Sequence, residues 1–385
     1  MIKSFISFLI EAAKVHATTG HLPHVEALLY EDPSKAFRHF DNTVNRFQNK
    51  PAEGKVSQKA DGGTSVKIAR MPDGTPAVGY KTGEWFTNHQ QIEDHAKKKK
   101  KAHYIDTYKP LLNMVSGMKK LKKGTAIQAD IIHQSDKPTE LPGTSKPNAI
   151  TYKIDKGHKL VLAAHSQYGI DGDGTLTKTS SHPDVSMLSA EGVHAPELAM
   201  KDNIKLQLSP QRTQAISNEL ASAKKAMTPE VTTFASGVRQ LHPKFKPFFD
   251  QYHGHASRTT GVRSVEGLKK YVARYMKKPS QVTKKTSAWR RATRKILNDT
   301  IDTHAHHFGP LFDTHNAMIR AKHHVLDQMR EHEGQFQLQT DGGEEHEGIV
   351  SSIGMPGVDE HQAKFVREGP AGFPKKNTDN ERTFK

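Results

Sequence analysis

A short stretch of the sequence, Lys55 to Arg70, combines a candidate nucleophile with a turn that suits a phosphate. Lys59 begins the motif K-A-D-G, a tight turn between a β-like run and a second short strand at 65–69. A lysine on a rigid strand can act as a nucleophile, because desolvation and neighbouring cations lower the pKa of its amine towards neutrality. Glycines in the turn let backbone N–H groups approach a phosphate closely. An ordinary hairpin with a surface lysine is the alternative interpretation.

Further β-like runs lie along the chain, separated by loops rich in Pro, Gly and Ser. Residues 90–121 have helical character and contain a run of lysines, Lys97 to Lys101. This run is either a solvated helix face or a phosphate contact without sequence preference. The β-like runs are P-A-V-G-Y-K-T-G-E-W-F at 76–86, T-A-I-Q-A-D-I-I-H at 125–133, N-A-I-T-Y-K-I at 148–154, K-L-V-L-A-A-H at 159–165, F-Q-L-Q-T at 336–340, E-E-H-E-G-I-V-S-S at 344–352 and H-Q-A-K-F-V-R-E at 361–368.

Size and charge restrict the class of protein. A chain of 385 residues can hold two or three domains, each with its own core. It has no cysteine, which excludes disulfides and thiolate metal sites. The formal net charge of +16 favours a polyanionic partner. Nucleic acid is favoured over membrane, because no stretch approaches the roughly eighteen apolar residues of a membrane span.

The positive charge is concentrated in a helical block. Hydrophobic spacing predicts helices over 209–226, 229–241, 264–276, 282–304 and 310–330. Residues 205–330 contain 23 Lys and Arg against 8 Asp and Glu, which accounts for +15 of the net charge of +16.

Two clusters in this block, at 269–278 and 284–295, mix basic residues with Tyr271, Tyr275 and Trp289. Basic side chains neutralise phosphates and aromatic rings stack on bases, so we expect a nucleic-acid surface here. The alternative is that the rings point into the helical core. The candidate contacts are Lys269, Lys270, Arg274, Lys277, Lys278, Lys284, Lys285, Arg290, Arg291, Arg294 and Lys295.

Histidines are frequent on the last predicted helices. Two imidazoles four residues apart on a helix can share a metal, but no acidic residue has the spacing of helical zinc motifs. We therefore do not expect a metal there. The histidines in question are His304, His306, His307, His315, His323, His324 and His332.

Taken in order, K-A-D-G at 59–62, Q-A-D-I-I at 128–132, E-G-I-V at 347–350 and A-K-F-V at 363–366 resemble the motifs of the covalent nucleotidyltransferases. That superfamily comprises ATP- and NAD-dependent DNA ligases, RNA ligases and mRNA capping enzymes. With H-L-P-H-V-E-A-L near the start, the layout looks like a branch found in T4-like phages. The resemblance covers roughly residues 50–175 and 335–370 and leaves the basic helical block unexplained.

This resemblance implies roles around the first motif. Lys59 would attack the α-phosphate of ATP, expel pyrophosphate and become lysyl-AMP. Asp61 and Gly62 would shape its turn. Lys81 and Gly83, in Y-K-T-G, look like the S-R-x-G motif that handles the substrate phosphate or the ribose.

Later matched residues would complete the nucleotide site. Asp130 stands where the family usually has a glutamate that binds the ribose or the metal-bound water, and it is one methylene shorter. Tyr152 falls where an aromatic residue stacks on the adenine. Glu347 matches the metal-binding glutamate, so Glu347 and Asp130 are the expected metal ligands. Lys364 matches the lysine that contacts the α-phosphate.

Two further departures from the family pattern affect basic residues. Thr64 stands where a basic residue usually follows the K-x-D-G glycine, so Lys67 or Arg70 must substitute or that contact is absent. Val366 occupies the second-lysine position of a K-x-K motif, which leaves Arg367 as a replacement.

The expected protein is an ATP-dependent polynucleotide ligase that forms lysyl-AMP and seals 5′-phosphate/3′-hydroxyl breaks. Its cofactors would be ATP and Mg²⁺ or Mn²⁺. Its partner would be nicked duplex DNA or a DNA/RNA hybrid, with no membrane contact, and the enzyme would be a monomer. Alternatives are an RNA ligase, another nucleotidyltransferase, or a phage internal DNA-binding protein without catalysis.

The implied fold is α+β: an antiparallel-sheet nucleotidyltransferase domain of ATP-grasp-like type, with a large inserted all-α basic domain. Met1 to Ala13 resembles a phage capsid-targeting peptide cut after Leu9-Ile10-Glu11, or is a first docking helix. The protein would act in the host-cell cytoplasm, with packaging in the phage head as an alternative. The expected parts are a leader with helices at 1–49, the nucleotidyltransferase domain at 50–204 and 333–370, the basic insertion at 205–332 and a flexible tail at 371–385.

Overall fold

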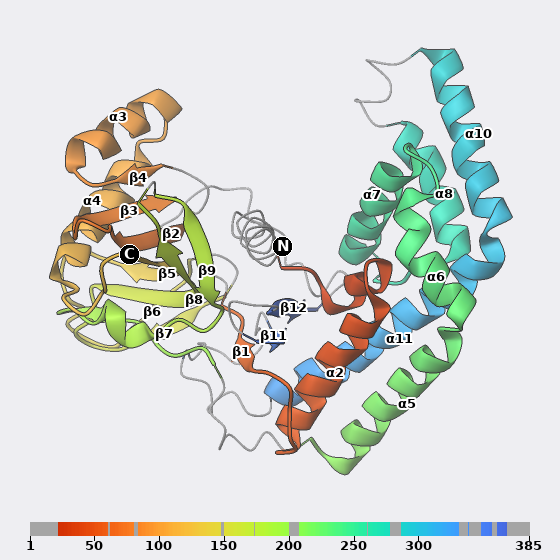
Figure 1. The fold of residues 1–385 in the computed structure, drawn as a ribbon, viewed down its shortest axis with the longest axis horizontal. Helices are drawn as coiled ribbons and strands as arrows, with labels where there is room; N and C mark the ends of the chain where they lie inside the picture. The colour runs from red at the N-terminus through yellow and green to blue at the C-terminus, as the bar shows by residue number, and fades with distance from the viewer. Residues whose placement is uncertain are drawn as a thin grey trace, which may run out of the picture.

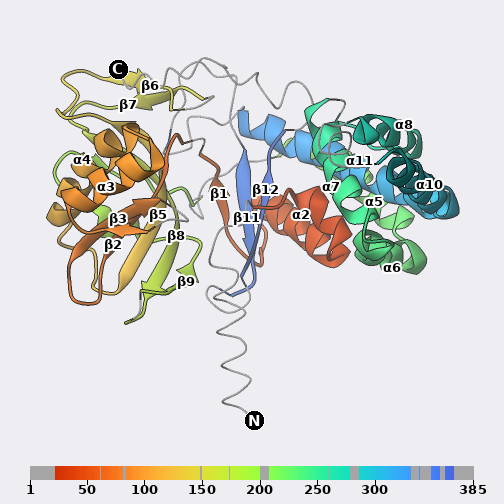
Figure 2. The same cartoon turned by 90° about the horizontal axis from the view of Figure 1, so that it is seen from above.

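A computed structural model gives the structure of the protein. It describes residues 22–60, 62–80, 84–147, 150–172, 174–199, 208–259, 261–277, 286–330, 338, 348–355 and 360–367. The protein is an α+β molecule, as the sequence predicts. A large sheet lies at one end, a helical block at the other, and a small sheet between them (Figures 1 and 2).

The larger sheet has seven strands in the order β10-β8-β5-β2-β3-β4, with β9 also paired to β8. Its pairs are antiparallel except β8 with β10. A separate hairpin joins β6 (Gly143–Ser145) to β7 (Tyr152–Ile154). The seven strands are β2 (Ser65–Arg70), β3 (Pro76–Tyr80), β4 (Trp85–Phe86), β5 (Thr125–Gln134), β8 (Leu160–Ile170), β9 (Leu176–Ser180) and β10 (Val193–His194).

One face of this sheet is covered by α3 (His89–Lys99) and α4 (His103–Gly117) (Figure 1). Val66 and Ile68 of β2 are fully buried in the core that these helices form with the sheet. Successive strand residues point to opposite faces, so Lys67 lies on the face turned away from the helices. That second face carries the polar side chains considered below.

The small sheet joins two distant parts of the chain. Its strands are β1 (Val56–Gln58), β11 (Ile349–Ile353) and β12 (His361–Phe365), with β11 in the centre and antiparallel to both neighbours. Gln58 pairs with Ile349. The small sheet therefore combines one strand from the first sixth of the chain with two strands from near the end of the chain.

The helical block begins with segments from the N-terminal part of the chain. Ser, Thr or Asp caps, each followed by Pro, start several helices, because the cap oxygen accepts a free backbone N–H and Pro needs none. The helices are η1 (Val25–Tyr30), α2 (Pro33–Phe47), α5 (Pro210–Ala226), α6 (Pro229–Gly237), η3 (Val238–Gln240), α7 (Phe245–Arg258), α8 (Val265–Met276), α10 (Ser287–Thr303) and α11 (Ala305–Arg330); η2 (Val185–Leu188) lies with the larger sheet.

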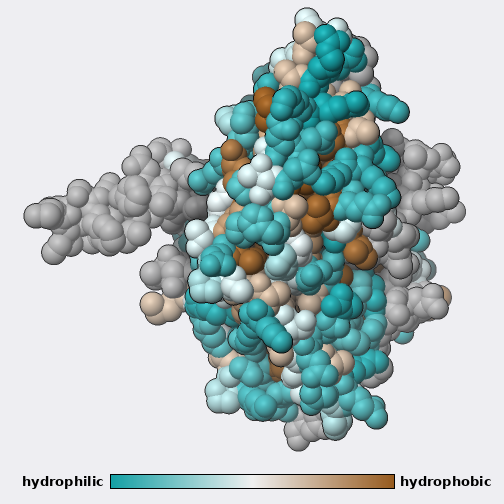
Figure 3. All heavy atoms as spheres, turned by 90° about the vertical axis from the view of Figure 1, so that its right-hand side faces the viewer, coloured by the Kyte–Doolittle hydropathy of each residue, from teal (hydrophilic) through white to brown (hydrophobic). Residues whose placement is uncertain are grey.

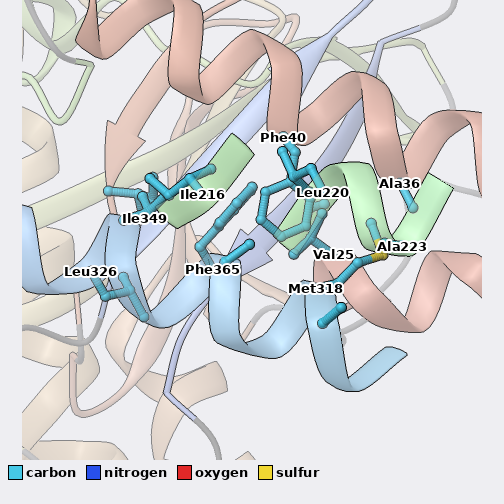
Figure 4. Packing of buried hydrophobic residues seen from close by; sticks show 14 of the residues in the cluster. Val25, Ala36, Phe40, Ile216, Leu220, Ala223, Met318, Leu326, Ile349 and Phe365 are labelled. Carbon is cyan, nitrogen blue, oxygen red and sulfur yellow. The ribbon is translucent and has the colours of Figure 1, made fainter. Parts of the chain in front are cut away.

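One core fixes the small sheet to the helical block. Phe40 of α2, Leu220 of α5 and Met318 of α11 pack with Ile349 and Phe365 of the small sheet (Figure 4). These side chains are at most 7% exposed. The segment from η1 to α2 thus belongs to the same packed body as the helices and the small sheet.

Two helix predictions differ from the structure. The helix α7 was missed, although Phe245, Phe248, Phe249 and Tyr252 have helical spacing and are buried. The last helix does not start at Pro310 but includes it in its second turn, where a proline removes only one early hydrogen bond. Within the described residues, no helix combines the length and apolar character that crossing a bilayer requires.

Candidate active site

Lys59 lies directly after β1 and beside the strand that follows Glu347 in the sequence. Its backbone N–H donates to the carbonyl oxygen of Gly348 at 2.9 Å. Gly348 has a φ of +129°, and a Cβ there would lie 1.9 Å from the carbonyl oxygen of Phe365, so only glycine fits. The K-A-D-G and E-G-I-V motifs are therefore neighbours in space.

The turn after Lys59 packs on β5. The Gly63 N–H donates to the carbonyl of Ile131, and the Ile131 N–H donates to the carbonyl of Thr64, both at 3.0 Å. A Cβ at Gly62 would lie 2.2 Å from the Cβ of Asp130. Gly62 is needed for this close approach, and its φ is not positive. The turn thus holds the predicted carboxylate close to the predicted nucleophile.

Asp130 is a half-buried carboxylate in a cationic setting. Burial alone would raise its pKa, but the hydrogen bond and charge of His165, with help from Ser65 and Lys59, lower the pKa below its ordinary value. His165 Nε2 lies 3.5 Å from Asp130 Oδ1. The close approach of Gly62 to Asp130 places Lys59, three residues earlier in the chain, in the same neighbourhood.

Lys364 lies on β12, paired with Val350 of β11. Its neighbours Ala363 and Phe365 are buried against the helical block, so alternation places Lys364 on the opposite face of the small sheet. Its backbone N–H donates to the carbonyl of Pro23 at 2.9 Å.

That opposite face turns towards the larger sheet, and Figure 2 shows the small sheet beside β8 and β9. Lys178 Nζ of β9 donates to Gln362 Oε1 of β12 at 2.9 Å. Ser181 Oγ donates to Glu360 Oε2 at 2.6 Å. The two sheets are thus joined by polar contacts on the side of the small sheet that carries Lys364.

Two predicted nucleotide contacts have other partners. Tyr152 is only 1% exposed and packs in an apolar cluster with Ile132 and Ala60, so its ring is a core side chain and not an open stacking platform. Arg367 forms an ion pair with Asp327 of α11. In the structure, Tyr152 packs in a core and Arg367 pairs with an acidic side chain of α11.

Several predicted site residues lie outside the described residues. They are Asp61, Lys81, Gly83, Glu347, Lys278, Lys284 and Lys285.

The predicted nucleic-acid residues that the structure describes lie on α8, directly after it, or on α10, at the end of the molecule far from the larger sheet (Figure 1). Figure 3 shows this end as mostly hydrophilic, with scattered hydrophobic residues. Some of the cations already have acidic partners, namely Lys269 with Asp302 at 2.5 Å, Lys270 with Glu266 at 2.6 Å and Lys295 with Asp299 at 2.7 Å. Arg274, Lys277, Arg291 and Arg294 are exposed, and Arg290 is half-buried.

The expectation that aromatic residues among these cations stack on bases is wrong for two of them. Tyr271 is 4% exposed and Tyr275 is 5% exposed, and both belong to the core of the helical block. Trp289 is half-buried against the same core, with Lys244 Nζ 5.1 Å from its ring centroid. The alternative interpretation, rings in the core and charges at the surface, describes this surface.

The histidines of α11 include one that is buried in the helical block. Among the described residues, no group of three or more His, Asp or Glu side chains is placed to hold a metal ion. His315 is buried and its Nδ1 lies 2.8 Å from Tyr30 Oη, which is a packing role. Burial lowers the pKa of His315 well below the ordinary value.

Sequence reasoning missed His165 and left the role of Lys67 open. Arg70 donates to the carbonyls of Gly74 and Met118, so it holds a loop. Lys67 is 6% exposed, and its Nζ lies 4.2 Å from the ring centroid of Trp85. Of the two suggested substitutes for the missing basic residue, only Lys67 lies on the site face. Strand alternation in the sequence could have placed Lys67 on this face. It could not have shown that His165 is the partner of Asp130.

The fold defines an α+β protein in which a small sheet joins a larger antiparallel sheet to a helical block. Residues 19–367 match the family DUF6267, described as a family of unknown function, and the chain belongs to it. Comparisons with curated proteins and with solved structures found no match.

Proposed function

We propose that this protein is an ATP-dependent polynucleotide ligase with a nucleotidyltransferase adenylation domain and an inserted basic helical domain. The observation that carries the proposal is the 2.9 Å hydrogen bond from the Lys59 N–H to the Gly348 carbonyl. A ligase of this kind needs the K-x-D-G lysine and the E-G-I-V carboxylate in one site. Asp130, which responds to the charge of Lys59, supports the same location.

The reaction would begin at the amine of Lys59. Its nitrogen attacks the α-phosphorus of ATP, an N–P bond forms, the P–O bond to pyrophosphate breaks and the amine loses a proton. An oxygen of the 5′-phosphate at a break then attacks the AMP phosphorus, the N–P bond breaks and the amine of Lys59 recovers a proton. A 3′-hydroxyl displaces AMP and closes the strand. Lys364 would neutralise charge on the α-phosphate.

Asp130 is suited to be one ligand of Mg²⁺ or Mn²⁺. Its lowered pKa keeps it a carboxylate at neutral pH, and these cations prefer oxygen ligands. Glu347 would be the second ligand. A bound ion supplies neutralisation of the phosphate oxygens.

The first experiment is incubation with α-labelled ATP and magnesium. We expect a labelled protein band that is lost in Lys59→Ala, because the amine of Lys59 would form the phosphoramidate bond to AMP. Lys55→Ala is the matched control, since Lys55 is an exposed lysine just before β1. A band that survives in Lys59→Ala would refute the assignment of the nucleophile.

A second candidate is a nucleic-acid-binding protein without catalysis. The exposed arginines of α8 and α10 favour it, because they need no nucleotide site to bind phosphates. Nucleic-acid binding without any labelled band would support this candidate. Nicked DNA and nicked RNA or hybrid duplexes, added to the labelled protein, would distinguish a DNA ligase from an RNA ligase or another transferase.

A further inference from the structure

A cross-strand row of residues lies on the face of the larger sheet that α3 and α4 leave uncovered. Lys67 of β2 pairs with Gly79 of β3 and with Gln128 of β5, and Gly79 pairs with Trp85 of β4. Paired residues of antiparallel strands place their side chains on the same face. The row therefore runs from Trp85, on an edge strand, to Gln128, near the middle of the sheet.

Gly79 allows Lys67 and Trp85 to meet. With no side chain between them, the Lys67 Nζ reaches a point 4.2 Å from the Trp85 ring centroid. A Cβ at Gly79 would lie 3.6 Å from Lys67 Cε and 2.5 Å from the carbonyl oxygen of Glu84. The sequence thus keeps an ammonium group against a flat ring at the edge of the sheet.

This row lies next to the proposed site of adenylation. Ser65, two residues before Lys67, pairs with Asp130. Two residues of strand cover about 7 Å, so Lys67 is one row away from the carboxylate. Gln128 bridges the rows, because its Nε2 lies 3.4 Å from Ser65 Oγ while its Oε1 accepts from Tyr168 Oη at 3.0 Å.

We propose that Lys67 and Trp85 bind the terminal nucleotide that carries the 5′-phosphate at a break, with the phosphate on Lys67 and the base against Trp85. A terminal phosphate carries about −1.5 to −2 charges at pH 7 against one for an internal phosphodiester, so a single buried cation discriminates between them. Trp85 is half-buried, and its ring would stack on the terminal base, an interaction that every base can make. The role of Lys67 and Trp85 in holding the 5′-phosphate that accepts AMP rests on the proposed function. Their binding of a terminal phosphate does not.

Burial makes this lysine responsive to an anion. It lowers the pKa of Lys67 from 10.5 to about 8. An arriving phosphate adds a direct charge interaction with the ammonium and raises that pKa again. Asp130 of β5 is the titratable group in the adjoining row, and Tyr168 of β8 lies beyond Gln128.

The binding test uses the fluorescence of Trp85, because the chain has only two tryptophans. In the full-length Trp289→Phe variant, Trp85 is the sole tryptophan. Short oligonucleotides with a 5′-phosphate should quench it at about tenfold lower concentration than the same oligonucleotides with a 5′-hydroxyl, as expected for one charged hydrogen bond. Adding Lys67→Met should abolish the difference. Adding Lys99→Met, an exposed lysine of α3, should preserve it.

Equal quenching by the two oligonucleotides, or a difference that survives Lys67→Met, would overturn the proposal. Lys67→Arg keeps the charge and should restore part of the difference, which separates loss of the cation from loss of the fold.

Labelled ATP then tests the acceptor role. Lys67→Met should keep the labelled band but lose transfer of AMP to a nicked duplex by at least about tenfold. Loss of the band itself would assign Lys67 to the nucleotide and overturn the acceptor role. Absence of a band in the unmodified protein would refute the proposed function and leave the fluorescence difference to decide on 5′-phosphate binding.

Discussion

A methyl group at residue 62 would collide with Asp130, since a Cβ there would lie 2.2 Å from the Asp130 Cβ. We expect Gly62→Ala to lower the free energy of unfolding by about 1–3 kcal/mol, the usual cost of overpacking, and to reduce adenylation. Gly143→Ala in β6 is the matched control, because a Cβ there has no neighbour within 4 Å. Urea unfolding measures both. Similar midpoints for the two variants would contradict the packing of the turn on β5.

The pKa of Lys67 has a consequence for stability. It falls from 10.5 to about 8 on folding because of burial. Between these values the unfolded chain binds a proton that the folded chain lacks, so stability rises with pH across that window. Below it, both states are protonated, and burial of the ammonium costs on the order of 1–3 kcal/mol.

Lys67→Met should therefore raise the free energy of unfolding at pH 7, and its advantage should shrink between pH 8 and pH 10.5. Urea unfolding at pH 7 and pH 10 gives the comparison. An advantage of the same size at both pH values would show that burial of the charge is not its cause.

At the residue scale, only the order of the motifs suggested that Lys59 and Asp130 lie near each other, and whether Lys364 joins them stays a prediction. It did not reveal His165, because a histidine on a β-like run has no distinguishing spacing. It also assigned Tyr152 a ligand role, since an aromatic residue on a strand looks the same whether its ring faces a core or a ligand.

Among the elements, η1 is held to α11 by a buried ion pair. Lys322 Nζ lies 2.5 Å from Glu26 Oε1, and both side chains are at most 1% exposed. Removing one partner leaves an uncompensated buried charge, so Glu26→Gln should destabilise the protein by about 3–5 kcal/mol. Asp41→Asn is the control, because it breaks an exposed pair with Lys224 and should cost at most about 1 kcal/mol.

The pH dependence of this element follows from the same pair. Burial opposes ionisation of Glu26, but Lys322 and His24 lower its pKa well below 4.5. The stabilisation is therefore present above pH 4.5 and is lost as the pH falls through the lower folded-state value. Acid unfolding of wild type and Glu26→Gln should converge at low pH, and a constant difference would contradict this origin.

Helix boundaries could be predicted where a cap and a proline coincide, as at Ser209-Pro210 and Thr228-Pro229. Helix boundaries could not be predicted where a proline or glycine lies inside a helix. Pro247 lies in the first turn of α7, where no backbone N–H is needed. Gly254 lies within α7 and Pro310 within α11, because packing of the aromatic core outweighs local propensity.

For the whole molecule, the surface of α8 and α10 predicts a salt-dependent affinity for nucleic acid. Arg291 and Arg294 are exposed, and within the described part of the chain neither has an acidic partner. Arg291→Gln/Arg294→Gln should reduce the slope of log affinity against log salt by up to about 2. Filter binding across salt concentrations measures the slope.

The charge-matched control is Lys270→Gln/Lys295→Gln, which removes two cations that already pair with Glu266 and Asp299. It should change the slope less. Equal changes for the two double variants would mean that net charge, and not the position of the arginines, sets the affinity.

The two-sheet arrangement is the part that sequence patterns alone could not supply. Strand character was visible in the Lys59 run and in 344–352, but no periodicity says that Gln58 pairs with Ile349. Long-range partners are fixed by the shared core of α2, α5 and α11, which forms only in three dimensions. The order of the motifs suggested that these two segments meet, and packing explains the pairing of β1 with β11.

The pairing of β1 with β11 also determines when, during synthesis, the proposed site can form. On the ribosome, the strands from 65 to 194 can assemble early, whereas the seam at Gly348 must wait until residue 365 has emerged. A nascent or interrupted chain would carry the amine of Lys59 without the groups that direct it. Under the proposed function, a fragment released by incomplete synthesis would not consume ATP.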